Sequence, residues 1–273
     1  MLKDIVVHLT GTEEDEIRLA YAEALSERFE AHVRGLYAYI LPTLISADPV
    51  AMAGVPAMTS FYEESAAEAG RTLKRLKERF SRLLMPSDVQ QLDVLSGTAG
   101  ETLSSRARTA DLFIATRPYG DPMDELNVEV EVLFGSGRPC LFVPPKSSAS
   151  TRFGRVVVAW NGTREAARAV ADALPIIKLA SEVIVVSAVE EETAPRKTDI
   201  ARHLSRHGVS VVLSDIETAS DGAGAALLKE VERLGGDLLV MGGYGHSRLR
   251  ELVLGGATRY VLSNARVPVL MSR

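Results

Sequence analysis

Short apolar runs alternate with amphipathic stretches along the whole chain, and the second half repeats the order of the first. The run DIVVHLTG (Asp4–Gly11) matches RVVVAWNG (Arg155–Gly162), and each is followed by Thr and a helical stretch. The other matching segments occur in the same order: helices at 13–29 and 164–180, apolar runs at 32–40 and 182–189, strands at 111–116 and 237–242, and closing strands at 139–143 and 268–271. This repeated order indicates duplication of one structural unit.

Several strands are continuously apolar, such as residues 156–160 and 183–186. Such runs are typical of parallel strands covered on both faces. Their alternation with helices predicts a doubly wound α/β sheet in each half, with ligands at the carboxyl ends of the strands. The proline- and serine-rich stretch after Val143 is typical of a linker. We therefore divide the chain into residues 1–144, a linker at 145–153, and residues 154–273.

The first half contains an additional segment, Leu41–Ser60, which is rich in Pro, Ala and Met. We interpret it as a lid or a packing loop, and the sequence does not distinguish these two roles. A long amphipathic helix is expected after it, near Phe61–Leu84.

Composition and charge narrow the function. The chain has 273 residues and a net charge of −5. Residues 1–144 carry 14 Lys and Arg against 22 Asp and Glu, whereas residues 145–273 carry 17 against 14. This balance argues against a nucleic-acid-binding protein and favours the second half for an anionic ligand. We expect a cytoplasmic protein without a membrane span, because no long apolar stretch or signal peptide is apparent.

The strongest motif follows the strand at 237–241. The sequence reads Gly-Gly-Tyr-Gly at 242–245, then nine residues, then Gly-Gly-Ala-Thr at 255–258, where a helix begins. Glycines allow the backbone to approach a ligand closely, and a helix N-terminus attracts phosphate. Residues 242–259 also carry three arginines and one acid. Phosphate binding is the favoured interpretation, and simple turn formation is the alternative.

This motif, the Met241-Gly242 strand end and the closing NARVPVLMS (Asn264–Ser272) resemble the universal stress protein family. The resemblance is strong over residues 153–273 and weaker over residues 1–144. It implies two tandem Rossmann-like domains, each a five-stranded, mainly parallel sheet flanked by helices. It also implies ATP or another adenine nucleotide as the ligand, which can bind with or without Mg²⁺.

Carried over by position, the resemblance implies a set of nucleotide-binding residues. Asn161 would face the adenine or ribose, and Val185 or Val186 would lie beside the base. The ribose and phosphates would contact Met241, Gly242 and Gly245, and residues 255–258 would hold the phosphate tail. The full predicted set is Ala159, Asn161, Val185, Val186, Met241, Gly242, Gly245, His246, Gly255, Gly256, Ala257 and Thr258.

Two positions depart from the family pattern. Asn161 stands where Asp is usual, and Gly256 stands where Ser or Thr is usual. The loss of one hydroxyl hydrogen bond weakens binding by about tenfold at most.

The first half lacks the glycine spacing, and Asp124, Glu125, Glu129 and Glu131 occupy the corresponding stretch. These charges would repel a nucleotide tail. We therefore expect a degenerate domain that pairs with the second half through the two closing strands. A homodimer and further protein partners stay open.

Other chemistry-bearing residues have simpler interpretations. His203 and His207 lie four apart on a predicted helix without a third ligand, which is typical of a solvated helix face. Cys140 lies within an apolar strand, where a thiol behaves as a core residue. No catalytic residues and no metal site are predicted, and His246 is a weak candidate for a general base.

The sequence thus predicts a stress-response protein that binds an adenine nucleotide in its C-terminal domain and acts as a regulator or conformational switch. The alternatives are an interaction scaffold with a vestigial site and a slow, self-phosphorylating ATPase.

Overall fold

The computed structural model describes residues 1–42, 55–95, 97–118, 128–146, 153–188, 197–216, 222–243 and 256–273. The first half contains β1 (Asp4–Leu9), α1 (Glu14–Phe29), β2 (His32–Ile40), α2 (Val55–Phe80), β3 (Ser87–Val94), α3 (Ala99–Ala107), β4 (Leu112–Thr116), α4 (Val128–Gly135) and β5 (Cys140–Val143). The second half contains β6 (Arg155–Ala159), α5 (Arg164–Ile177), β7 (Glu182–Ala188), α6 (Lys197–Arg206), β8 (Val211–Ile216), α7 (Ala223–Arg233), β9 (Leu238–Gly242), α9 (Gly256–Asn264) and β10 (Val269–Ser272).

Each half forms a five-stranded parallel sheet, as the sequence predicts. The strand orders are β3-β2-β1-β4-β5 and β8-β7-β6-β9-β10, so the order reverses beside β1 and beside β6. All pairs within a half are parallel. The two halves are therefore tandem copies of one Rossmann-like arrangement.

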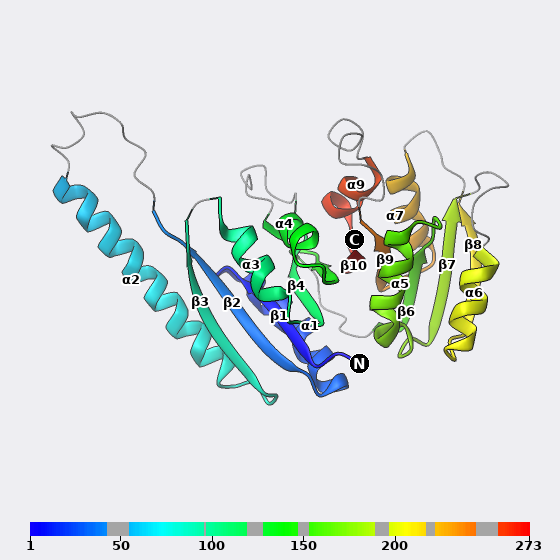
Figure 1. Ribbon diagram of the computed structural model, residues 1–273, viewed down its shortest axis with the longest axis horizontal. Coiled ribbons are helices and arrows are strands. Elements are labelled where there is room, and N and C mark those ends of the chain that lie inside the picture. Colours follow the sequence, from blue (N-terminus) through cyan, green and yellow to red (C-terminus); the bar gives the residue numbers. More distant parts are fainter. Residues whose placement is uncertain are drawn as a thin grey trace.

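The two sheets join into one ten-stranded sheet (Figure 1). β5 pairs with β10 in antiparallel fashion, and Leu141 lies opposite Leu270. All four residues of each strand are buried. The expected pairing of the halves through their closing strands is confirmed. Each strand covers an edge that would otherwise present unpaired backbone groups.

Helices cover both faces of the sheet. One hydrophobic cluster lies beneath α1, α2, α5 and α6, and a second lies beneath α3, α4, α7 and α9. Both clusters extend across the joint, because β5 contributes Leu141 to the first and Phe142 to the second. The joint is thus part of the hydrophobic core.

Helix α2 corrects one expectation. It begins at Val55 and extends along the outer edge of the first half (Figure 1), so residues 55–60 are helical and the expected loop through Ser60 is wrong there. The remainder of that additional segment, residues 43–54, lies outside the described residues. Pro56 is the second residue of α2, a position where a helix tolerates proline because no intrahelical N–H bond is lost.

Candidate nucleotide site and its counterpart in the first half

The turn after β6 is built by its own side chains. The Asn161 side-chain oxygen accepts hydrogen bonds from the Thr163 backbone N–H (3.3 Å) and the Thr163 hydroxyl (2.8 Å). The Thr163 hydroxyl oxygen in turn accepts from the Ala166 N–H (3.3 Å), so Thr163 caps α5. Asn161 itself is exposed. Its oxygen shapes the turn, and its exposed amide lies at the strand end, where a ligand of the sheet would bind.

The residues expected beside the base lie on different faces of the sheet. Val185 belongs to the cluster beneath α5 and α6, whereas Val186 belongs to the cluster beneath α7 and α9. Both side chains are buried, and so is that of Met241. Met241 and Ala159 share the second face with Val186 and therefore lie on the same side of the sheet as α9.

One glycine of the motif is required by packing against backbone, and a second lies close to side chains. A Cβ atom on Gly242 would lie 2.5 Å from the Ala166 backbone nitrogen, so β9 approaches the start of α5 too closely for any side chain. A Cβ atom on Gly243 would lie 2.7 Å from the Met271 sulfur and 3.2 Å from Leu133 of the first half. These two glycines have structural reasons that do not involve a ligand.

The start of α9 differs from those two positions. Apart from its chain neighbours and the backbone of α9 itself, no atom of the described structure lies within 4 Å of the position a Cβ would take on Gly256. Gly256 and Ala257 are exposed, and Thr258 is half-buried. α9 has nine residues, and its first turn carries no acidic residue. Backbone N–H groups at such an end have no intrahelical partner and favour an anion. Gly245, His246 and Gly255 lie outside the described residues.

The strand registers align the two halves residue by residue. Phe113 of β4 pairs with both Val6 of β1 and Cys140 of β5. Leu239 of β9 pairs in the same way with Val157 and Val269. Counting along the chain from these positions relates side chains beside these strands in the first half to side chains in the second. His8 corresponds to Ala159, Asp15 to Ala166, Arg18 to Ala169, and Glu129 to Thr258.

At the start of α4, the first half places a carboxylate. Glu129 is buried in the first turn of α4, and its Oε1 lies 3.2 Å from His8 Nδ1 at the end of β1. Burial raises the pKa of Glu129, but His8, the backbone and the charge of Arg18 together outweigh burial, so the pKa lies below its ordinary value. The favourable position for a negative charge at this helix end is taken by the protein itself.

The turn after β1 is filled in the same manner. The carboxylate of Asp15 accepts hydrogen bonds from the backbone N–H groups of Thr10 (2.9 Å) and Gly11 (2.8 Å). Its partner is Arg18, which is 1% exposed and donates to Asp15 (2.6 Å) and to the Thr10 hydroxyl (2.7 Å). The second half has only alanines at both positions. The side chains of Asp15 and Arg18 thus occupy the turn after β1 in the first half.

Sequence reasoning identified Glu129 but missed His8, Asp15 and Arg18. A histidine within the otherwise apolar run DIVVHLTG was the available signal, because buried polar side chains need a partner. Nothing local in the sequence indicates that this partner comes from α4, since the two segments are far apart along the chain.

The remaining candidates lie elsewhere. His203 and His207 are both exposed, with ring centroids 4.8 Å apart. Within the described residues, no group of three or more His, Cys, Asp or Glu is arranged to hold a metal ion.

Cys140 is fully buried, and burial raises the pKa of its thiol well above the ordinary value. No described helix is long and apolar enough to cross a membrane.

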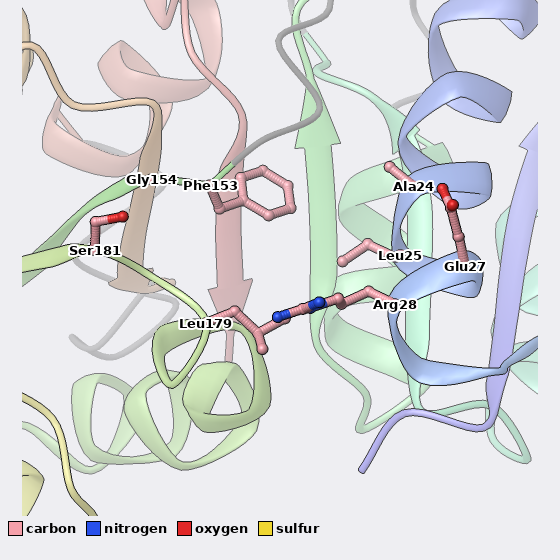
Figure 2. Close-up of a pocket in the computed structure, with 8 residues that line it drawn as sticks. All are labelled: Ala24, Leu25, Glu27, Arg28, Phe153, Gly154, Leu179 and Ser181. Atoms are coloured by element: carbon pink, nitrogen blue, oxygen red, sulfur yellow. The ribbon is translucent and has the colours of Figure 1, made fainter.

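A cavity of about 720 Å³ opens where the two halves meet, between α1 and the end of α5 (Figure 2). It is lined by Ala24, Leu25, Glu27, Arg28, Phe153, Gly154, Leu179 and Ser181. Phe153 stacks on Tyr21 of α1, with the ring centroids 6.0 Å apart. The described residues of the predicted nucleotide site do not line this cavity.

The arrangement defines a doubly wound α/β protein with two Rossmann-like halves, one with an open helix terminus at its strand ends and one with that terminus filled. Residues 152–273 match the model of the universal stress protein family. The chain therefore carries a universal stress protein domain in its C-terminal half.

Individual proteins are similar to a part of this chain in sequence or to the whole of it in fold. A universal stress protein of Synechocystis is 41% identical over 59 residues, which is 22% of this chain and 21% of that protein. The chain matches only about a fifth of the length of that curated relative. A universal stress protein structure from Archaeoglobus fulgidus is similar over 99% of this chain and 96% of its own, with 15% identity and a TM-score of 0.74. A Pseudomonas aeruginosa protein of unknown function covers 99% and 92%, with 14% identity and a TM-score of 0.60. These two structures share the fold of the whole chain.

Proposed function

We propose that the C-terminal half binds an adenine nucleotide, ATP or a close relative, and that binding regulates the conformation of this stress protein. The observation that carries the proposal is the open N-terminus of α9, where Gly256 and Ala257 are exposed. Its counterpart at α4 is closed by Glu129. A ligand changes a conformational equilibrium only through its different affinities for the states, so the nucleotide would favour one arrangement of α9 and its neighbours.

The described residues fit such a ligand in chemistry. Backbone N–H groups at Gly256 and Ala257 would bind phosphate oxygens, and the Thr258 side chain lies one residue further along the helix. Asn161 lies at the end of β6, where the base or ribose would lie. Mg²⁺, when it accompanies ATP, would neutralise phosphate charge. We propose no catalytic residue.

A second candidate function is an interaction scaffold with a vestigial site. The packing roles of Gly242 and Gly243 favour it, because these glycines would be retained without any ligand. Both proposals include a degenerate first half. There, side chains of the chain itself occupy the turn after β1 and the start of α4.

Calorimetric titration with ATP separates the two functions. Thr258→Glu places a carboxylate at the position that Glu129 takes in the first half, and we expect it to weaken ATP binding by more than about tenfold through charge repulsion. Thr258→Ser keeps the hydroxyl and serves as the matched control. Equal binding by all three proteins would remove the proposed site, and no binding by the wild type would favour the scaffold.

A further inference from the structure

One arginine of the first half reaches the far end of α9. Arg117 follows β4, and its backbone N–H continues the sheet by donating to Val143 O (2.8 Å). Its Nη1 donates to the carbonyl oxygen of Leu262 (2.9 Å) and to that of Ser263. Both carbonyls belong to the last turn of α9. The side chain therefore connects the strand ends of one half to the proposed phosphate-binding helix of the other.

These contacts satisfy a specific requirement of α9. The last carbonyl groups of a helix have no intrahelical partner, and a positive charge near them is favourable. The last turn of α9 contains no basic residue of its own. Arg117 supplies this cation, and one nitrogen of its guanidinium, Nη1, donates to both carbonyls.

The environment of Arg117 makes the contact strong. The side chain is half-buried, and burial lowers the pKa of Arg117, while the nearby charge of Glu14 opposes this effect. A guanidinium stays charged in proteins, so the contacts with Leu262 and Ser263 are charge-assisted and partly shielded from water.

The opposite end of α9 is fixed by close packing. Gly224 of α7 allows the backbone of Ala257 to approach, since a Cβ there would lie 2.8 Å from the Ala257 oxygen. α9 is therefore held by α7 near its start and by Arg117 at its end. A change at one end of a short rigid helix alters the direction of the N–H groups at the other.

We propose that Arg117 is a positioning residue through which the first half sets the orientation and stability of α9, and thereby the nucleotide affinity of the second half. This inference rests on the proposed function for its effect on affinity, but not for its effect on α9. The degenerate half acts as an internal regulatory subunit. By thermodynamic linkage, nucleotide binding also strengthens the contact between Arg117 and α9.

The test compares Arg117→Gln, Arg117→Lys and Arg108→Gln with the wild type. Arg108 is the matched control, because its Nε and Nη2 lie 3.4 Å from the Gly135 carbonyl at the end of α4, within the first half. Two quantities are measured on the full chain: hydrogen exchange of the amides of residues 260–264, and ATP affinity by calorimetry.

We expect Arg117→Gln to accelerate exchange in α9 by about tenfold and to weaken ATP binding by about three- to tenfold. Arg117→Lys should give intermediate values, since it keeps the charge but places its nitrogen differently from Nη1, and it serves if the glutamine variant does not fold. Arg108→Gln should change neither quantity.

Unchanged exchange in α9 for both Arg117 variants would overturn the proposal, as would equal effects of Arg108→Gln. Faster exchange with unchanged ATP affinity would also overturn it, because α9 would then be held by Arg117 without consequence for the site. If the wild type binds no ATP, the proposed function fails, and exchange alone decides whether Arg117 holds α9.

Discussion

The starts of α4 and α9 are equivalent positions in two copies of one fold, and they differ in what occupies them. The first half buries Glu129 against His8 there, while the second has Thr258 and Ala159. The turns after β1 and β6 differ in the same way, because Asp15 and Arg18 are replaced by alanines. Two copies of one fold can thus differ in whether side chains of the chain itself contact the backbone groups at equivalent strand ends.

The two copies of the duplicated unit also differ in the side chains at their strand ends. In the first half, the charged side chains of Asp15, Arg18 and Glu129 lie at the strand ends, where a ligand of such a sheet would bind. In the second half, Gly256 and Ala257 at the equivalent helix end are exposed, and the described residues place no carboxylate in the first turn of α9. The joint through β5 and β10 keeps the copies together, and Arg117 reaches from the filled half to the open one.

The largest expected effect comes from the buried pair of the first half. Arg18→Met leaves the Asp15 carboxylate buried without its cation, which should lower the free energy of unfolding by about 3 kcal/mol. Arg202→Met removes an exposed arginine that pairs with Asp199, and it should cost less than about 1 kcal/mol. Urea unfolding measures both. Similar values for the two variants would contradict a structural role for Arg18.

A smaller effect separates the two kinds of glycine in the motif. Gly242→Ala forces a Cβ atom against the backbone of α5 and should lower the free energy of unfolding by about 2 kcal/mol. Gly256→Ala meets no neighbouring element among the described residues within 4 Å and should change this free energy by less than about 0.5 kcal/mol. Thermal unfolding without ligand compares them. A large loss for Gly256→Ala would mean that α9 is not open at its start.

The smallest effect depends on pH. Because the pKa of folded Glu129 lies below its ordinary value of 4.5, its ionised form stabilises the folded state above that pH. This stability is lost as the pH falls through the folded pKa. Glu129→Gln should therefore lower the free energy of unfolding by about 1 kcal/mol at pH 7, and the difference should shrink below about pH 4.5.

The exposed neighbour Glu131 provides the control for this pH dependence. Glu131→Gln removes an exposed carboxylate from the same helix and should change the free energy of unfolding at pH 7 by less than about 0.5 kcal/mol. A difference between Glu129→Gln and the wild type that stays constant down to pH 3 would show that the carboxylate charge is not what stabilises α4.

Much of the fold could be predicted from the sequence, because its signals are local. Strand β2 has the predicted bounds, His32–Ile40, and the closing strands pair as expected since each is a short apolar run after a proline. The start of α2 could not be predicted in this way, because Pro56 suggested a loop whereas it occupies the first turn of a helix.

The site was predictable only in part. The glycine spacing marks where the backbone is bare, but it does not separate Gly242, which packing requires, from Gly256, which is open. The contact of His8 with Glu129 and that of Arg117 with α9 each join segments more than a hundred residues apart. No local pattern encodes such pairs, because they depend on how the two halves and their strands are aligned.

The most direct measurement is the number of ATP molecules bound per chain, counted by native mass spectrometry at saturating ATP and Mg²⁺. The account predicts one molecule per chain in the wild type and none in Thr258→Glu. Two molecules per chain would contradict it, because the first half would then bind nucleotide despite Glu129 and Arg18. One molecule that persists in Thr258→Glu would contradict it equally, because the ligand would lie away from the start of α9.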